Sequence, residues 1–185
     1  MKKVFLDKFK ESPENKLLYL IAGIDFVIVL LVFLLIFIPI EASVLTYGIL
    51  DYEFVWTESR AETILSVWGV EGIAKQSSAI YWDFLYIVGY TSLALSLIVL
   101  VLRKTEGKIQ KLGVYTTLTP FLTGLFDIIE NINLLIMMNT PTSVSMINAF
   151  TASLSAMIKF SFLFAAIIYF VVALIIIIIG RVKTH

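Results

Sequence analysis

Four stretches of this chain are each long and apolar enough to cross a membrane as a single helix. They cover residues 17–38, 80–102, 114–138 and 150–179. A membrane-spanning helix needs about 20 mostly apolar residues to cross roughly 30 Å of hydrocarbon. The composition agrees, because 59% of the residues are apolar and the mean hydropathy is +0.96. The sequence therefore predicts an all-α polytopic membrane protein, in which residues 1–185 form one up-down-up-down bundle of four transmembrane helices.

Basic residues are distributed unevenly along the chain. Eleven Lys and Arg residues lie near the two termini and in residues 103–113, whereas the long loop 39–79 holds only Arg60 and Lys75. Cytoplasmic segments of membrane proteins retain positive charge. The chain is therefore predicted to be a multi-pass protein of the cell membrane, with both termini in the cytoplasm and the long loop outside.

The loop 39–79 is far longer than a connection between two neighbouring helices needs to be. Pro39 is expected to end the first span, and the residues up to Trp56 are expected to be extended or to form a small hairpin. Ser59 to Glu62 has the form of a capping box, which predicts a short helix ending near Gly69. Its apolar residues, which we expect to face the bundle, are Ile64, Leu65, Val67 and Trp68. This predicts a short amphipathic helix that roofs the bundle or seals its helix ends.

Ionisable residues inside membrane spans are costly to bury, so each one is a candidate for a functional site. The predicted spans contain Asp25, Asp83, Asp127, Glu130 and Lys159. Asp127, Glu130 and Asn131 lie at positions i, i+3 and i+4, which places them on one face of the third helix. Tyr86 and Tyr90 follow Asp83 at i+3 and i+7. The candidate binding residues are therefore Asp127, Glu130, Asn131, Lys159, Asp83, Tyr86, Tyr90 and Asp25.

The depth of each group follows from the rise of 1.5 Å per helical residue. Glu130 and Lys159 lie at similar depths, so they are expected to form an ion pair. Asp127 and Asp25 lie deeper and at a similar level, so they could share a proton or a cation if their helices are neighbours. The predicted spans contain one lysine, which is expected to pair with Glu130, so neither of these two carboxylates is expected to have a cationic partner.

Several classes of chemistry find no support in the sequence. The chain has no cysteine, and its one histidine is the last residue, His185, which argues against disulfides, thiol catalysis and most transition-metal sites. No nucleotide-binding or hydrolase motif is present. Zero net charge and the lack of a basic stripe argue against nucleic acid as a partner. The carboxylates with Asn131 could hold Mg²⁺ or Na⁺, but their spacing does not require a metal, so no metal, cofactor or catalytic residue is assigned.

Three segments resemble a recurring set of uncharacterised four-pass prokaryotic membrane proteins. The segments are residues 59–90, 126–135 and 155–164. They include a D-x-x-E-N motif at Asp127, Glu130 and Asn131 in the third span and a Lys-Phe pair at Lys159 in the fourth. The resemblance implies a four-span membrane fold and implies no activity.

Three functions remain open at this point. The preferred one is that the bundle binds or moves a small hydrophobic or amphiphilic molecule in an intramembrane polar pocket. The second is a lipid-modifying enzyme with Asp127 or Glu130 as acid or base and Lys159 stabilising charge. The third is a structural or accessory membrane subunit whose polar groups only fasten helices together. Membrane lipid and a small amphiphilic ligand are the expected partners, and a homo-oligomer is compatible with all three functions.

Overall fold

The computed structural model describes residues 5–44 and 46–182, and these residues form helices joined by short loops, without strands. In chain order the helices are η1 (Phe5–Lys10), α1 (Asn15–Val32), η2 (Phe33–Phe37), α2 (Ile38–Ala42), α3 (Ile49–Glu53), α4 (Glu58–Leu102), α5 (Gly107–Thr116), α6 (Thr119–Asn139) and α7 (Met146–Val182). Among the described residues, four helical stretches are long and apolar enough to cross a membrane, namely Asn15–Ala42, Glu58–Leu102, Gly107–Asn139 and Met146–Gly180. The prediction of an all-helical chain with four stretches that could span a membrane is confirmed for the described residues.

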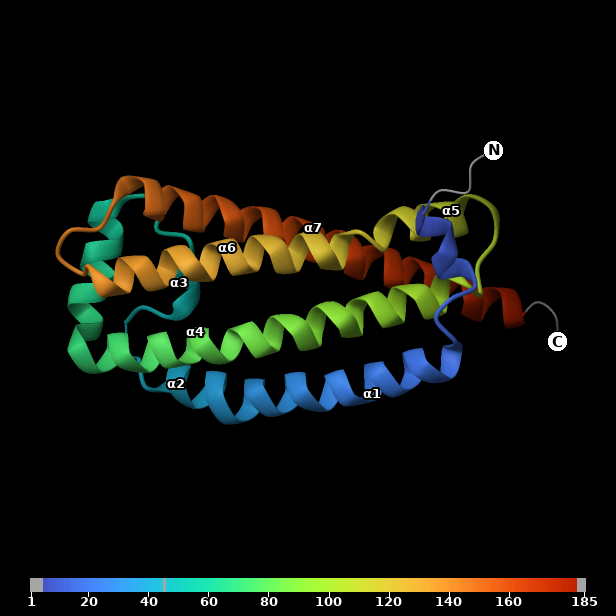
Figure 1. Cartoon of the computed structure of the whole chain (residues 1–185), viewed down its shortest axis with the longest axis horizontal. Helices are drawn as coiled ribbons and strands as arrows, with labels where there is room; N and C mark the ends of the chain where they lie inside the picture. The colour runs from blue at the N-terminus through green and yellow to red at the C-terminus, as the bar shows by residue number, and fades with distance from the viewer. Residues whose placement is uncertain (1–4, 45, 183–185) are drawn as a thin grey trace.

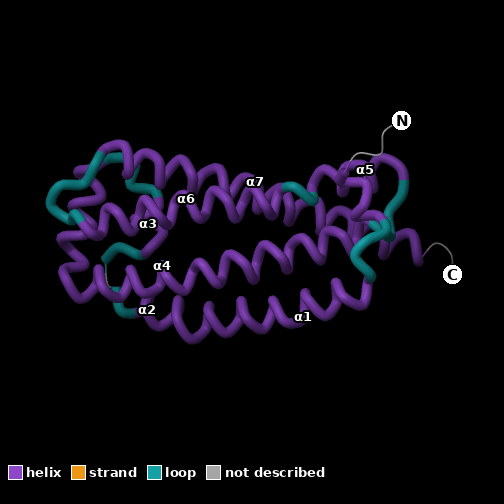
Figure 2. The backbone as a smooth tube through the Cα atoms, viewed as in Figure 1, coloured by secondary structure: helices purple, strands orange, loops and turns teal. Residues whose placement is uncertain are grey.

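The four long helices lie side by side along the long axis of the molecule, and each runs opposite to the one before it (Figure 1). α1 packs against α4, and α6 packs most extensively against α7. η1, α5 and the C-terminal part of α7 lie at one end of the bundle, whereas α3 and the start of α4 lie at the other end (Figure 2). We call these the α5 end and the α3 end.

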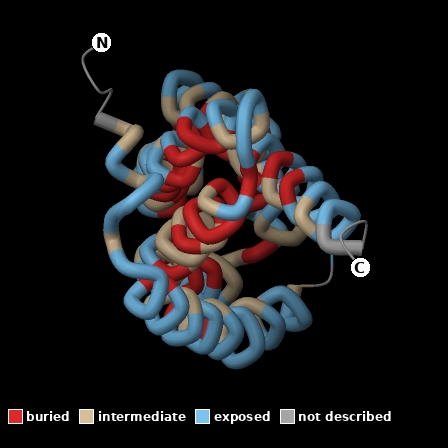
Figure 3. Tube along the Cα trace, turned by 90° about the vertical axis from the view of Figure 1, so that its right-hand side faces the viewer, coloured by how far each residue is buried: buried red, intermediate tan, exposed pale blue. Residues whose placement is uncertain are grey.

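Apolar side chains cover the outside of this bundle as well as its interior. The exposed fraction is 59% for Leu20 and 56% for Phe26 on α1, and 62% for Ile168 on α7. Buried residues gather where the helices face one another, while the outer side of α1 is largely exposed (Figure 3). An apolar surface of this kind is normal against lipid and unfavourable against water.

The first helical stretch passes through Pro39 instead of ending there, so the prediction of a helix end at this proline is wrong. Proline has no N–H to donate and its ring crowds the preceding turn. The chain accommodates it with a π-helical turn, Phe33–Phe37, after which α2 begins with Pro39 in its first turn. A π-helical turn adds a residue to the turn and shifts the side chains that follow. Phe33 and Phe37, the first and last residues of this turn, line the cavity described below.

α4 starts within the predicted outer loop and continues to the end of the second span. Thr57, rather than Ser59, caps it, because the Thr57 hydroxyl accepts a hydrogen bond from the Arg60 N–H at 3.4 Å. The helix is broken at Gly69, where φ is +61°, a conformation that glycine adopts at low cost. Val67, which was expected to face the bundle, is half exposed.

Within the segment before α4, Ile49–Glu53 form the short helix α3 where an extended segment or a hairpin was predicted, and the described residues on either side of it are loop. Tyr52 of α3 is fully buried, its ring centroid lies 4.9 Å from that of Trp68, and its hydroxyl donates to the Leu134 carbonyl at 3.4 Å. The Trp68 indole N–H donates to the Tyr47 carbonyl at 2.8 Å. These contacts fix α3 against α4 and α6 at the α3 end, and they decide where the last residue of α3, Glu53, is placed.

The third long helical stretch is divided into α5 and α6, and the fourth, α7, begins earlier than predicted. α5 precedes α6, and α6 ends at Asn139, one residue beyond the predicted end of the third span. α7 begins at Met146, four residues before the predicted start. Ala152 and Ala156 of α7 are fully buried. Small residues at this spacing allow two helices to approach closely, which explains the tight packing of α7 on α6.

Candidate functional site

Three carboxylates surround one ammonium group inside the bundle. The Lys159 Nζ atom lies 2.8 Å from Glu130 Oε2, 2.9 Å from Asp127 Oδ1 and 3.4 Å from Glu53 Oε2. Lys159 follows Ala152 and Ala156 on the face of α7 that packs on α6, so its side chain points at the polar face of α6. The predicted ion pair between Glu130 and Lys159 is confirmed. We call Glu53, Asp127, Glu130 and Lys159 the charged cluster.

The charged cluster is almost completely withdrawn from solvent. The exposed fraction is 0% for Glu130, 4% for Asp127, 7% for Lys159 and 9% for Glu53. Buried charges are tolerated when partners compensate the lost hydration, and a single ammonium group, that of Lys159, lies beside three carboxylates and offsets part of their charge. Burial nevertheless raises the pKa of Glu53, in the segment between the first two long helices, and the nearby Lys159 ammonium opposes this shift.

Further hydrogen bonds extend the charged cluster toward α4. The Tyr90 hydroxyl donates to Asp127 Oδ2 at 2.6 Å, so both Asp127 oxygens have a partner. The Asn131 amide, one turn further along α6, donates to Asp83 Oδ2 at 2.6 Å. The predicted polar face of α6 therefore contacts α4 through Asp127 and Asn131, and it contacts α7 through Asp127 and Glu130.

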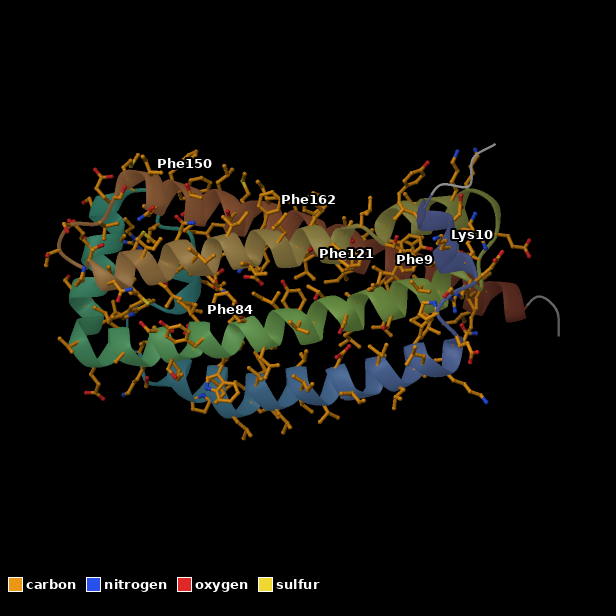
Figure 4. The ribbon with its side chains drawn as sticks, in the orientation of Figure 1. Phe9, Lys10, Phe84, Phe121, Phe150 and Phe162 are labelled. Atoms are coloured by element: carbon orange, nitrogen blue, oxygen red, sulfur yellow. The ribbon has the colours of Figure 1, made fainter. Side chains whose placement is uncertain are left out.

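A cavity of about 560 Å³ adjoins these groups. Its polar lining residues include Asp83, Tyr86, Tyr90, Asp127, Asn131 and Lys159, and its apolar lining residues include Phe33, Phe37, Ile80, Phe160 and Leu163. These residues come from η2, α4, α6 and α7, and residues of α2 and α3 complete the lining. The volume lies within the range of about 300–1,000 Å³ typical of small-molecule sites. Side chains fill much of the remaining space between the helices, as Figure 4 shows with Phe84 between α4 and α6.

Most predicted site residues meet at this cavity, but Asp25 does not. Its carboxylate accepts a hydrogen bond from the Ser92 hydroxyl of α4, and Asp25 is not part of the cavity lining. Asp127 bonds to Tyr90 and Lys159 instead. The prediction that Asp127 lacks a cationic partner is therefore wrong, and the two aspartates bind separate partners rather than each other. The reason is that α1 packs on α4 and not against α6.

The sequence prediction missed several polar residues that line the cavity, among them Glu53 and Gln76. Glu53 looked like an ordinary acidic residue of an outer loop, and only the burial of its neighbour Tyr52 brings it into the bundle. Gln76 is 1% exposed and lines the cavity, and its Nε2 atom has no hydrogen-bond partner among the described residues. The position of Gln76 three residues before Ala79 and seven before Asp83 on α4 could have indicated that these residues share a face.

The site is rich in carboxylates, which are common ligands of hard cations. Within residues 5–44 and 46–182, no group of three or more His, Cys, Asp or Glu side chains is placed to hold a metal ion. The Lys159 ammonium lies at the centre of the three cluster carboxylates, in the position that a cation would need.

Comparison with known proteins does not assign this site. No family model matches the chain, and neither a curated protein nor a solved structure matches it.

Proposed function

We propose that this chain is a multi-pass membrane protein that binds a small amphiphilic molecule in the cavity beside the charged cluster. The observation that supports the proposal is a cavity of about 560 Å³ whose lining combines apolar side chains with several polar and charged ones. The apolar side chains accommodate a hydrocarbon body, and the polar ones accommodate a polar end group. A ligand of this kind reaches the cavity from the surrounding lipid.

The orientation of the chain in the membrane decides from which side the cavity is reached. Basic residues such as Lys10, Arg103 and Lys108 belong to the α5 end, where Figure 4 also shows Lys10. Cytoplasmic segments carry such an excess of positive charge. In our proposal the α5 end faces the cytoplasm, and the cavity lies nearer the opposite, outer side, because α2 and α3 line it.

Two alternative functions make different demands on the same residues. An accessory subunit whose polar groups only fasten helices needs a filled interior, whereas here Gln76 lines an open space with an unpartnered N–H group. An acid-base enzyme needs a carboxylate that is free to exchange protons with its substrate. Asp127 is engaged by Lys159 and Tyr90, and Glu130 pairs with Lys159 and does not line the cavity. These contacts favour binding over catalysis.

A substitution that fills the cavity tests the proposal without removing a charge. Ala79 lines the cavity, so Ala79→Phe should occupy the space of the ligand. Ala165, on the exposed outer side of α7, provides a matched control with the same substitution. The proteins are purified from membranes, their thermal unfolding is compared, and their bound lipids are identified by mass spectrometry.

We expect wild type and Ala165→Phe to retain the same bound amphiphile at near-stoichiometric level and folded Ala79→Phe to lose it. A species that stays bound in Ala79→Phe would contradict the assignment of the cavity. The absence of any specific species from the wild type would favour a structural role for the charged cluster.

A further inference from the structure

The balance of charges around the cavity restricts the head group that it can accept. Four acidic residues, Glu41, Glu53, Asp83 and Asp127, line the cavity, and among the described lining residues Lys159 alone carries a positive charge. The negative charges therefore exceed the positive ones when all groups are ionised. A cationic head group lowers the electrostatic energy of this lining, and an anionic one raises it.

Carboxylates already surround the Lys159 ammonium group. Three carboxylate oxygens lie within 3.4 Å of the Lys159 Nζ atom, one each from Glu53, Asp127 and Glu130. A phosphate or carboxylate ligand beside Lys159 would add a further negative charge to these buried carboxylates, which is costly.

Aromatic rings line the cavity together with the carboxylates. The ring centroids of Phe37 and Tyr86 lie 5.0 Å apart, and those of Tyr86 and Tyr90 lie 5.5 Å apart. All three rings line the cavity, and Asp83 precedes Tyr86 by one helical turn. The faces of aromatic rings attract cations, and quaternary ammonium groups in particular are bound by clusters of such rings. Rings next to a carboxylate thus suit an organic ammonium group.

Gln76 gives an independent indication that a ligand completes the cavity. Its side chain is 1% exposed, and its Nε2 donor has no partner within the described part of the chain. A buried donor without a partner costs free energy, so such groups are normally paired with a ligand or water. A ligand oxygen near the head group would provide the missing acceptor.

We propose that the amphiphile bound in this cavity carries a cationic amine or quaternary ammonium head group, with an oxygen acceptor close to it. The ammonium group contacts Asp83 and the rings of Phe37 and Tyr86, the oxygen accepts from Gln76, and the hydrocarbon part lies against Phe33 and Leu163. The inference rests on the proposed function, since it specifies the chemistry of the ligand for the same cavity.

The test compares three amphiphiles that share a dodecyl chain and differ in charge: dodecyltrimethylammonium, dodecanol and dodecyl phosphate. The full chain is reconstituted into nanodiscs of an uncharged galactolipid, and binding of radiolabelled dodecyltrimethylammonium is corrected with empty nanodiscs. Unlabelled dodecanol and dodecyl phosphate serve as competitors. Asp83→Asn and Tyr86→Leu are the site variants, and Asp25→Asn removes an aspartate outside the cavity as a control.

We expect saturable binding of the ammonium compound that is at least about tenfold tighter than that of either competitor. Each site variant should weaken it at least about fivefold, whereas Asp25→Asn should bind like the wild type. Two site variants are used because one of them could unfold, and thermal unfolding identifies such a variant.

The two proposals fail in different ways. If all three amphiphiles bind equally well, or if the phosphate binds best, and Ala79→Phe abolishes this binding, the cation preference is wrong while the cavity remains a binding site. If none of the three binds saturably, the cation inference is overturned. Failure of the proposed function itself is then decided separately, by whether the wild type and Ala79→Phe co-purify with the same lipids.

Discussion

Replacing Lys159 by methionine removes the one ammonium group of the charged cluster and keeps a side chain of similar length. Three carboxylates, from Glu53, Asp127 and Glu130, would then face one another with no cation within 3.4 Å. Removing one partner of a buried ion pair typically costs about 3–5 kcal/mol. Lys159 is 7% exposed, so solvent screens this loss little. We expect Lys159→Met to reduce the free energy of unfolding by about that amount.

The loss translates into a measurable thermal shift. For a chain of this size, 1 kcal/mol corresponds to about 2–4 °C in Tm, so we expect a decrease of about 6–20 °C in a mild detergent. Neutralising one carboxylate should recover part of the loss, because less negative charge is then left uncompensated. The double variant Lys159→Met with Asp127→Asn should therefore be more stable than the sum of the two single effects by about 0.5–3 kcal/mol.

Lys75→Met is the matched control for this experiment. Lys75 pairs with Glu71 at 2.7 Å on the surface of α4, where both side chains are exposed. Exposed ion pairs contribute little to stability, so this variant should unfold like the wild type. If Lys159→Met changes Tm no more than Lys75→Met does, the charged cluster does not support the fold as we describe it. Strict additivity of Lys159→Met and Asp127→Asn would refute the coupling between the two groups.

Two further predictions concern single residues. Because burial raises the pKa of Glu53 above its usual value of 4.5, the native state holds the proton more tightly, and the contribution of Glu53 to stability is lost as pH rises through its native pKa. Thermal unfolding should therefore show a larger stability advantage of the wild type over Glu53→Gln at about pH 5 than at about pH 8. A difference in stability that does not change with pH would contradict the raised pKa of Glu53. Gly113→Ala should destabilise by about 1–3 kcal/mol, because the new Cβ would overlap with the Tyr169 hydroxyl group. Gly23→Ala, whose Cβ meets nothing within 4 Å, should unfold like the wild type or slightly later, and an equal loss in both variants would refute the packing argument.

The sequence indicates the main elements of this fold because long apolar stretches have few alternatives. A membrane span of about 20 residues must form all its backbone hydrogen bonds internally, so its helical state does not depend on tertiary contacts. The meeting of Glu130 with Lys159 was predictable for a similar reason, since both lie at comparable depths and each needs a partner there. The polar face formed by Asp127, Glu130 and Asn131 follows from helical periodicity alone.

The predictions that were wrong concern tertiary packing, which helical periodicity does not determine. Depth along the bundle suggested that Asp25 could meet Asp127, but depth does not say which helices are neighbours, and α1 packs on α4. Glu53 joins the charged cluster because Tyr52 and Trp68 pack the outer segment into the bundle end. Propensity favoured an extended conformation for this segment of aromatic and β-branched residues, and tertiary contacts outweigh that preference.

Cysteine labelling tests most directly whether an accessible cavity reaches the charged cluster. The chain contains no cysteine, so a single introduced thiol reports on one position. Ala79 lines the cavity, whereas Ala149 is fully buried in the packed core near α3 and does not line it. We predict that Ala79→Cys reacts with a small methanethiosulfonate reagent in membranes and that Ala149→Cys does not. Equal protection of both thiols, in variants that unfold like the wild type, would mean that the interior is filled and that the account of a binding cavity is wrong.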